Sequence, residues 1–158
     1  MYLSIHATAG VLIGSYTNSS LIAFVVGFFS HFLLDMVPHR DGQLPIEDLS
    51  IKQIRRRYFD KIVAIVYLDL CVSTVVAGAL LTNNLHFITP SILWGIIGSI
   101  APDVLQIFAF MFPKIKPLQR FQKLHNTLHY NPKRQKISLV AGHLTQLLTL
   151  LTLIRPLV

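Results

Sequence analysis

Long apolar runs separated by short polar segments extend along most of this chain. Four of these runs are about 17 to 24 residues long, enough for a helix to cross about 30 Å of hydrocarbon. They are Leu21–Val37, Lys61–Leu81, Pro90–Phe112 and Ile137–Leu153. A shorter run, Leu3–Ser15, is marginal for crossing, and we expect it to be re-entrant or tilted. The pattern predicts an all-α polytopic membrane helix bundle with four to five spans, forming one integral-membrane domain over residues 1–158.

The segment Pro117–Tyr130 has a different pattern, because its apolar residues recur at helical spacing among polar ones. Leu118, Phe121, Leu124 and Leu128 follow this spacing. The pattern predicts a cytoplasmic amphipathic helix lying at the membrane surface. The stretch from His39 to Asp60 is charged, and we expect it to be a partly helical loop.

Composition supports a membrane protein. Hydrophobic residues make up 53% of the chain and charged residues 13%, with a mean hydropathy of +0.56. This charged fraction is about half that of a typical soluble domain. The formal net charge is +7, which in a soluble protein would point to nucleic acid. Thirteen of the 14 lysines and arginines, however, fall within Arg40–Lys61 and Lys114–Lys136. Such clustering indicates membrane orientation and contact with anionic lipid, and we expect no nucleic-acid partner.

The positive-inside rule places both basic segments in the cytoplasm. The N-terminus is then cytoplasmic and the C-terminus lies outside. The first residues lack the basic start of a signal peptide, so we expect them to be retained. Cys71 is the one cysteine, which excludes an internal disulfide and a thiolate cluster. Any metal site must therefore use histidine and carboxylate ligands.

Three aspartates, Asp35, Asp69 and Asp103, lie inside the apolar runs. Ionisable side chains are costly in a bilayer, so they indicate a functional site with partners close by. His31 lies one helical turn before Asp35, so both side chains project from one helix face. His39 follows Asp35 by four residues. Carboxylates and imidazoles at this spacing are typical of a metal site.

The expected topology brings these groups together, because six of the seven histidines and all three membrane aspartates fall in the cytoplasmic half of the bilayer. We therefore expect a divalent metal, zinc or alternatively manganese or iron, with one to three ions. The expected ligands are His6, His31, Asp35, His39, Asp69, Asp103, His125, His129 and His143.

Each group alone has a simpler explanation. A single membrane histidine is more often a hydrogen-bonded packing residue, Asp69 could pair with Lys61, and His125 with His129 could form a solvated helix face. One alternative function is therefore a non-catalytic scaffold whose polar cluster fixes helix packing. Another is a transporter of divalent metal or protons, which requires polar residues as far as the outer face. The polar residues there lie near loops: Ser19, Ser20, Thr82, Asn83, Asn84 and His86.

These motifs resemble those of the bacterial inner-membrane metal-dependent hydrolases of the YdjM type, which are related to zinc-dependent phospholipase C and P1 nuclease. The matching pieces are His6, His31-x3-Asp35, Pro102-Asp103 and His125-x3-His129. The resemblance implies a bacterial inner-membrane location and hydrolysis of a phosphoester by a metal cluster.

A lipid or lipid-linked phosphoester suits a site at headgroup depth, with membrane lipid as substrate or environment. Carboxylates such as Asp35 and Asp103 can bridge ions about 3.5–4 Å apart, a spacing used for phosphoester hydrolysis. We expect Asp35, Asp103 and His129 to be catalytic. Arg40 could hold a phosphate through two parallel hydrogen bonds, or serve only as a cytoplasmic anchor. The oligomeric state does not follow from the sequence.

Overall fold

The computed structural model describes residues 1–40, 51–82, 89–130 and 137–157. Within them the regular structure is entirely helical, in agreement with the predicted all-α class. The helices are α1 (Leu3–Ser15), α2 (Ser20–Asp35), α3 (Ile51–Thr82), α4 (Pro90–Met111), α5 (Lys116–Leu128) and α6 (Leu139–Ile154). A short 3₁₀ helix, η1 (Arg155–Leu157), follows α6.

Three helices begin at hydroxyl-bearing N-caps. The side chains of Ser19, Thr89 and Ser138 accept hydrogen bonds from backbone N–H groups at the starts of α2, α4 and α6. Such caps satisfy donors that the first helical turn would otherwise leave without a partner. These polar residues stand immediately before apolar runs, which explains why the expected and observed helix starts agree within two residues there.

Glycines bring α1, α2 and α4 into backbone contact. A Cβ atom added at Gly10 or at Gly27 would lie 2.6 Å from the carbonyl oxygen of Gly95, closer than atoms can pack. Gly27 stands eight residues before Asp35, and Gly95 eight before Asp103. The two similar segments therefore pack against each other through their glycines, as small residues allow in membrane bundles. This contact sets the spacing of the two helices that carry the aspartates.

Helix α3 differs from the expected segment because it begins ten residues earlier, at Ile51 rather than Lys61. The added stretch contains glutamine, arginine and lysine, which are good helix formers, and no glycine or proline. The basic residues that the sequence assigned to a loop therefore continue an apolar helix. The rest of the expected loop, residues 41–50, lies outside the described residues.

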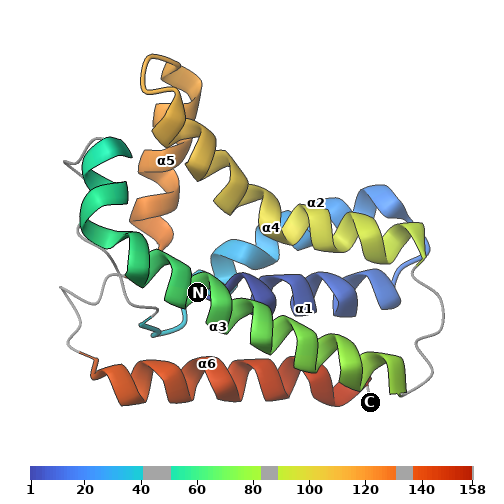
Figure 1. The fold of residues 1–158 in the computed structure, drawn as a ribbon. Helices are drawn as coiled ribbons and strands as arrows, with labels where there is room; N and C mark the ends of the chain where they lie inside the picture. The colour runs from blue at the N-terminus through green and yellow to red at the C-terminus, as the bar shows by residue number, and fades with distance from the viewer. Residues whose placement is uncertain (41–50, 83–88, 131–136, 158) are drawn as a thin grey trace.

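Figure 1 shows how the helices lie relative to one another. Helix α1 begins, and α2 ends, at the same end of the bundle. Helix α5 runs crosswise to α1 and α6 at that end. Helix α4 contains Pro102, which can make no N–H···O bond within the helix. In Figure 1 the polypeptide changes direction between α4 and α5.

Two helical segments are long and apolar enough to cross a membrane: Pro90–Ala109 in α4, and Leu139–Leu157 covering α6 and η1. Helices α1 and α2 are apolar but shorter. The expectation of four to five spans is thus supported for two helices. Many large apolar side chains on the outer faces are exposed, among them Leu21, Phe29, Val140 and Leu148 at 62–73%. Hydrocarbon around the bundle would cover them.

Candidate metal centre

Helix α2 supplies two groups at the centre of the site. His31 and Asp35 stand one helical turn apart, and Nε2 of His31 lies 3.1 Å from Oδ2 of Asp35. Both side chains are at most 1% exposed. The HxxxD spacing therefore places both groups on one face, as the sequence predicts.

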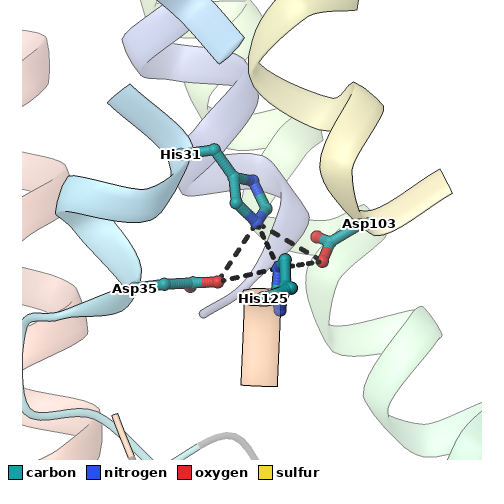
Figure 2. A group of neighbouring side chains, drawn as sticks. All are labelled: His31, Asp35, Asp103 and His125. Carbon is teal, nitrogen blue, oxygen red and sulfur yellow. Dashed lines mark hydrogen bonds and ion pairs between the residues drawn. The ribbon is translucent and has the colours of Figure 1, made fainter. Parts of the chain in front are cut away.

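Helices α4 and α5 complete a first group of possible ligands. His31, Asp35, Asp103 and His125 each offer one atom, and these atoms lie within 4.8 Å of one another. Figure 2 shows the four side chains converging from three helices. Nε2 of His125 lies 3.5 Å from Asp35 Oδ2 and 3.9 Å from Asp103 Oδ1. Two histidines and two carboxylates can hold a divalent transition metal.

A second group shares Asp35 with the first. Asp35, His39 and His129 also place their ligand atoms within 4.8 Å of one another. His129 lies just past the end of α5 with extended backbone, because the helix ends at Leu128 and not at Tyr130 as expected. The following N–H, of Tyr130, donates to the backbone oxygen of Asp35 at 2.8 Å. This bond joins the ends of α2 and α5 and keeps His129 over the site.

The atom at which both groups meet is Oδ2 of Asp35. It is buried and has no hydrogen-bond partner in the part of the chain that is described. Three imidazole nitrogens nevertheless surround it, from His31 at 3.1 Å, His125 at 3.5 Å and His129 at 3.7 Å. A buried carboxylate oxygen without a donor is costly. A cation among these atoms would remove that cost.

Backbone carbonyls orient three of the imidazoles. The Nδ1 atom of His31 donates a hydrogen bond to Ser99 O at 2.8 Å. The Nδ1 atom of His39 donates to Val37 O at 2.7 Å, and the Nδ1 atom of His129 donates to Tyr130 O at 2.9 Å. A carbonyl only accepts, so each Nδ1 carries the proton. In the neutral ring Nε2 then holds the lone pair. This arrangement is the usual outer support of metal-binding histidines.

His125 is supported by a side chain instead. Its Nδ1 makes a short contact with the amide nitrogen of Gln106 on α4. Amide nitrogen and oxygen positions are assigned from the network, and with Gln106 turned over, its oxygen would accept the Nδ1 proton. Burial lowers the pKa of His125 to about 4. Its imidazole is therefore neutral at neutral pH, the form that binds a metal.

His6 and the α-amino group of Met1 occupy the other side of Asp35. Nε2 of His6 lies 3.2 Å from Asp35 Oδ1, and its ring stacks on His31 with centroids 4.0 Å apart. The α-amino nitrogen of Met1 lies 2.9 Å from the same oxygen and is fully buried. Oδ1 thus faces an ammonium group, whereas Oδ2 faces the imidazoles.

Three of the expected site residues lie elsewhere. The carboxylate of Asp69 on α3 accepts hydrogen bonds of 3.0 Å from the backbone N–H groups of Leu3 and Ser4, and so caps the start of α1. His143 is exposed on α6, and its Nδ1 is 3.5 Å from the hydroxyl of Tyr2. The Arg40 guanidinium donates to Ile137 O at 3.3 Å. The two groups of ligand atoms therefore contain His31, Asp35, His39, Asp103, His125 and His129. His6 contacts Asp35 but lies outside both groups, and Asp69, His143 and Arg40 lie farther away, also outside both.

The supporting contacts are the part of the site that sequence reasoning missed. The carbonyls of Ser99, Val37 and Tyr130 leave no residue-type signal, since any residue offers one. The contact of Met1 with Asp35 also depends on how α1 packs. Gln106 does carry a signal in the sequence, because it shares one polar side of α4 with Ser99 and Asp103. Lipid cannot satisfy such side chains, so they are expected to contact protein, and Gln106 contacts His125.

Comparison with known proteins yields no relative. No family model matches the chain, no curated protein is similar to it, and no solved structure matches its fold.

Proposed function

We propose that this protein is a membrane-embedded, metal-dependent hydrolase of a phosphoester in a lipid or lipid-linked substrate. Its metal site is at the cytoplasmic face of a bacterial inner membrane. The observation that carries the proposal is Oδ2 of Asp35, which is buried, has no hydrogen-bond partner among the described residues and is surrounded by three imidazole nitrogens. Zinc fits these ligands best, and manganese or iron would also bind to them.

Asp35 belongs to both ligand groups, so it would help to hold an ion in either of them. Asp103 and His125 would hold the first ion, and His39 and His129 the second. Such ions would supply activation of a water molecule and stabilisation of the leaving oxygen of a phosphoester. The chain itself supplies negative charge from the carboxylates of Asp35 and Asp103, and imidazole nitrogens in rings of which three are oriented by backbone carbonyls.

Access to the site also favours a reaction over a purely structural cluster. The side chains of Asp103 and His129 are 33% and 21% exposed, whereas those of His31, Asp35 and His125 are at most 1% exposed. The cluster is thus closed on the α1–α2 side and open beside Asp103 and His129. Water and a phosphate group could reach the proposed ions from that side. A scaffold that only fixes helix packing does not need such an opening.

The Asp103→Asn variant tests the proposal. It keeps the size of the side chain and removes the charge that would hold a cation. We expect purified wild-type protein to contain a transition metal and to hydrolyse a phosphoester lipid. Chelator should stop the reaction and added metal should restore it. Asp103→Asn should remain folded and membrane-inserted but inactive. Wild-type hydrolysis in both Asp103→Asn and Asp35→Asn would contradict the hydrolase and favour a scaffold.

A further inference from the structure

The outer face of α5 carries a row of three cations, Lys116, Arg120 and Lys123, here called the cationic stripe. They stand at positions i, i+4 and i+7, so they share one side of the helix. All three are exposed. His125 lies on the opposite side of the same helix and is buried in the metal centre. Helix α5 therefore has a ligand-bearing inner face and a charged outer face.

Packing of the inner face holds the stripe in one direction. The ring of Phe121 lies 6.3 Å from each of the rings of Phe28 and Phe32 on α2. The side-chain amide of Gln119 donates to Ala109 O on α4 at 2.7 Å. Rotation of α5 would break these contacts and withdraw His125, so the stripe faces away from the bundle.

Within the described ranges of the chain, no ion pair neutralises the charge of the stripe. Asp103 is the last acidic residue in the sequence, and none follows among residues 104–158. Among the described residues, the ion pairs involve the site histidines and the α-amino group, and none includes the stripe. A compact group of exposed cations favours an anionic partner.

Exposed apolar side chains beside the stripe indicate what that partner is. Met111, Phe112 and Ile115, at the junction of α4 and α5, are 51%, 46% and 46% exposed, and Leu124 on α5 is 53% exposed. The apolar segment of α4 ends at Ala109, only a few residues earlier. Binding of free phosphate would require only the cations and would not explain the exposed apolar side chains beside them. Cations bordered by apolar side chains at the end of a possible span suit a lipid surface.

We propose that the cationic stripe binds the headgroups of anionic phospholipids while Met111, Phe112, Ile115 and Leu124 enter the acyl boundary. Helix α5 thus lies on the bilayer surface with His125 directed inward. This inference depends on charge and exposure and does not depend on a bound metal or on hydrolysis. Each cation near an anionic surface contributes about fivefold in binding, so three act strongly together.

Hydrogen exchange of the full chain in lipid nanodiscs tests the proposal. One set of discs contains phosphatidylcholine alone and the other includes phosphatidylglycerol. We expect the backbone N–H groups of α5 to exchange several-fold more slowly with phosphatidylglycerol. In the variant K116Q/R120Q/K123Q, the amount of this lipid needed for half of the protection should rise on the order of tenfold or more.

The variant R56Q/R57Q/R155Q is the matched control, because it removes the same charge from exposed positions outside α5. It should keep the protection of α5. Equal exchange in both lipids would contradict the proposal, as would equal loss in the control variant. Protection by inorganic phosphate in phosphatidylcholine discs would show a soluble anion site and would also overturn it. Metal content, measured on the same samples, should be the same in K116Q/R120Q/K123Q as in the wild type. This measurement separates the test of lipid binding from the test of the hydrolase.

Discussion

His31 and His125 direct their Nε2 atoms at each other across 2.9 Å, although 94 residues separate them in the sequence. The carbonyl of Ser99 takes the Nδ1 proton of His31, so in the neutral ring its Nε2 offers a lone pair. The low pKa of His125, about 4, keeps the ring of His125 neutral at neutral pH. At most one proton can lie between the two nitrogens. A cation bound to both, and to Asp35 beside them, satisfies all three groups together.

Removal of the Asp35 charge should therefore abolish metal binding. In Asp35→Asn the shared ligand of both groups is lost, and we expect metal content to fall from stoichiometric to trace while the helix content stays the same. Elemental analysis of purified protein and circular dichroism measure the two quantities. Asp60→Asn is the matched control, since Asp60 is exposed on α3. Full metal content in Asp35→Asn would show that the site does not bind through α2.

The helices were largely predictable because their signals are local. The apolar runs in the sequence match α1, α2, α4 and α6 within two residues at every end. Helix α3 begins ten residues before the expected apolar segment, within the stretch expected to be a partly helical loop, because the arginines and lysine there favour helix. The end of α5 was placed two residues late, since the extended backbone of His129 depends on its contact with α2.

The geometry of a pair of candidate ligands is predictable where their spacing within one helix decides it. The pair His31 and Asp35 is such a case, and its one-turn spacing puts both groups on one face. Asp69 shows the limit. A carboxylate in an apolar run signals that a partner exists, but it does not distinguish a cation from two backbone N–H groups. The partner, the start of α1, is some 65 residues away and becomes visible only in the packed structure.

Asp69→Ala should separate stability from metal binding. The variant removes a cap on α1, and such a loss typically costs about 0.5–2 kcal/mol. We expect thermal unfolding at a lower temperature with metal content still stoichiometric. Asp60→Ala, on the exposed side of the same helix, should leave both quantities unchanged. If Asp69→Ala loses its metal without a loss of stability, then Asp69 is a ligand after all.

Gly27→Ala should destabilise the bundle although alanine is the better helix former by about 1 kcal/mol. Its Cβ atom would lie 2.6 Å from Gly95 O and 3.1 Å from Ser99 N, so α2 and α4 must move apart. Because Ser99 O orients His31, metal affinity should fall as well. Thermal unfolding and metal titration measure the two effects. Val26→Ala, at an exposed neighbouring position, is the control, and equal stability of Gly27→Ala and wild type would contradict the tight contact.

The direction of the bundle in the membrane gives the last prediction. Helices α1 and α2 are joined by the turn at Asn18, at the end of α1 opposite Met1 and the metal centre. The two basic segments favour a cytoplasmic site, so this turn should face the outside. In a Cys71→Ser background, a cysteine at Asn18 should react with an impermeant thiol reagent on intact cells. A cysteine replacing Asn126, exposed on α5, should react only after lysis. The reverse pattern would place the metal centre on the outer face and exclude a substrate from the inner leaflet.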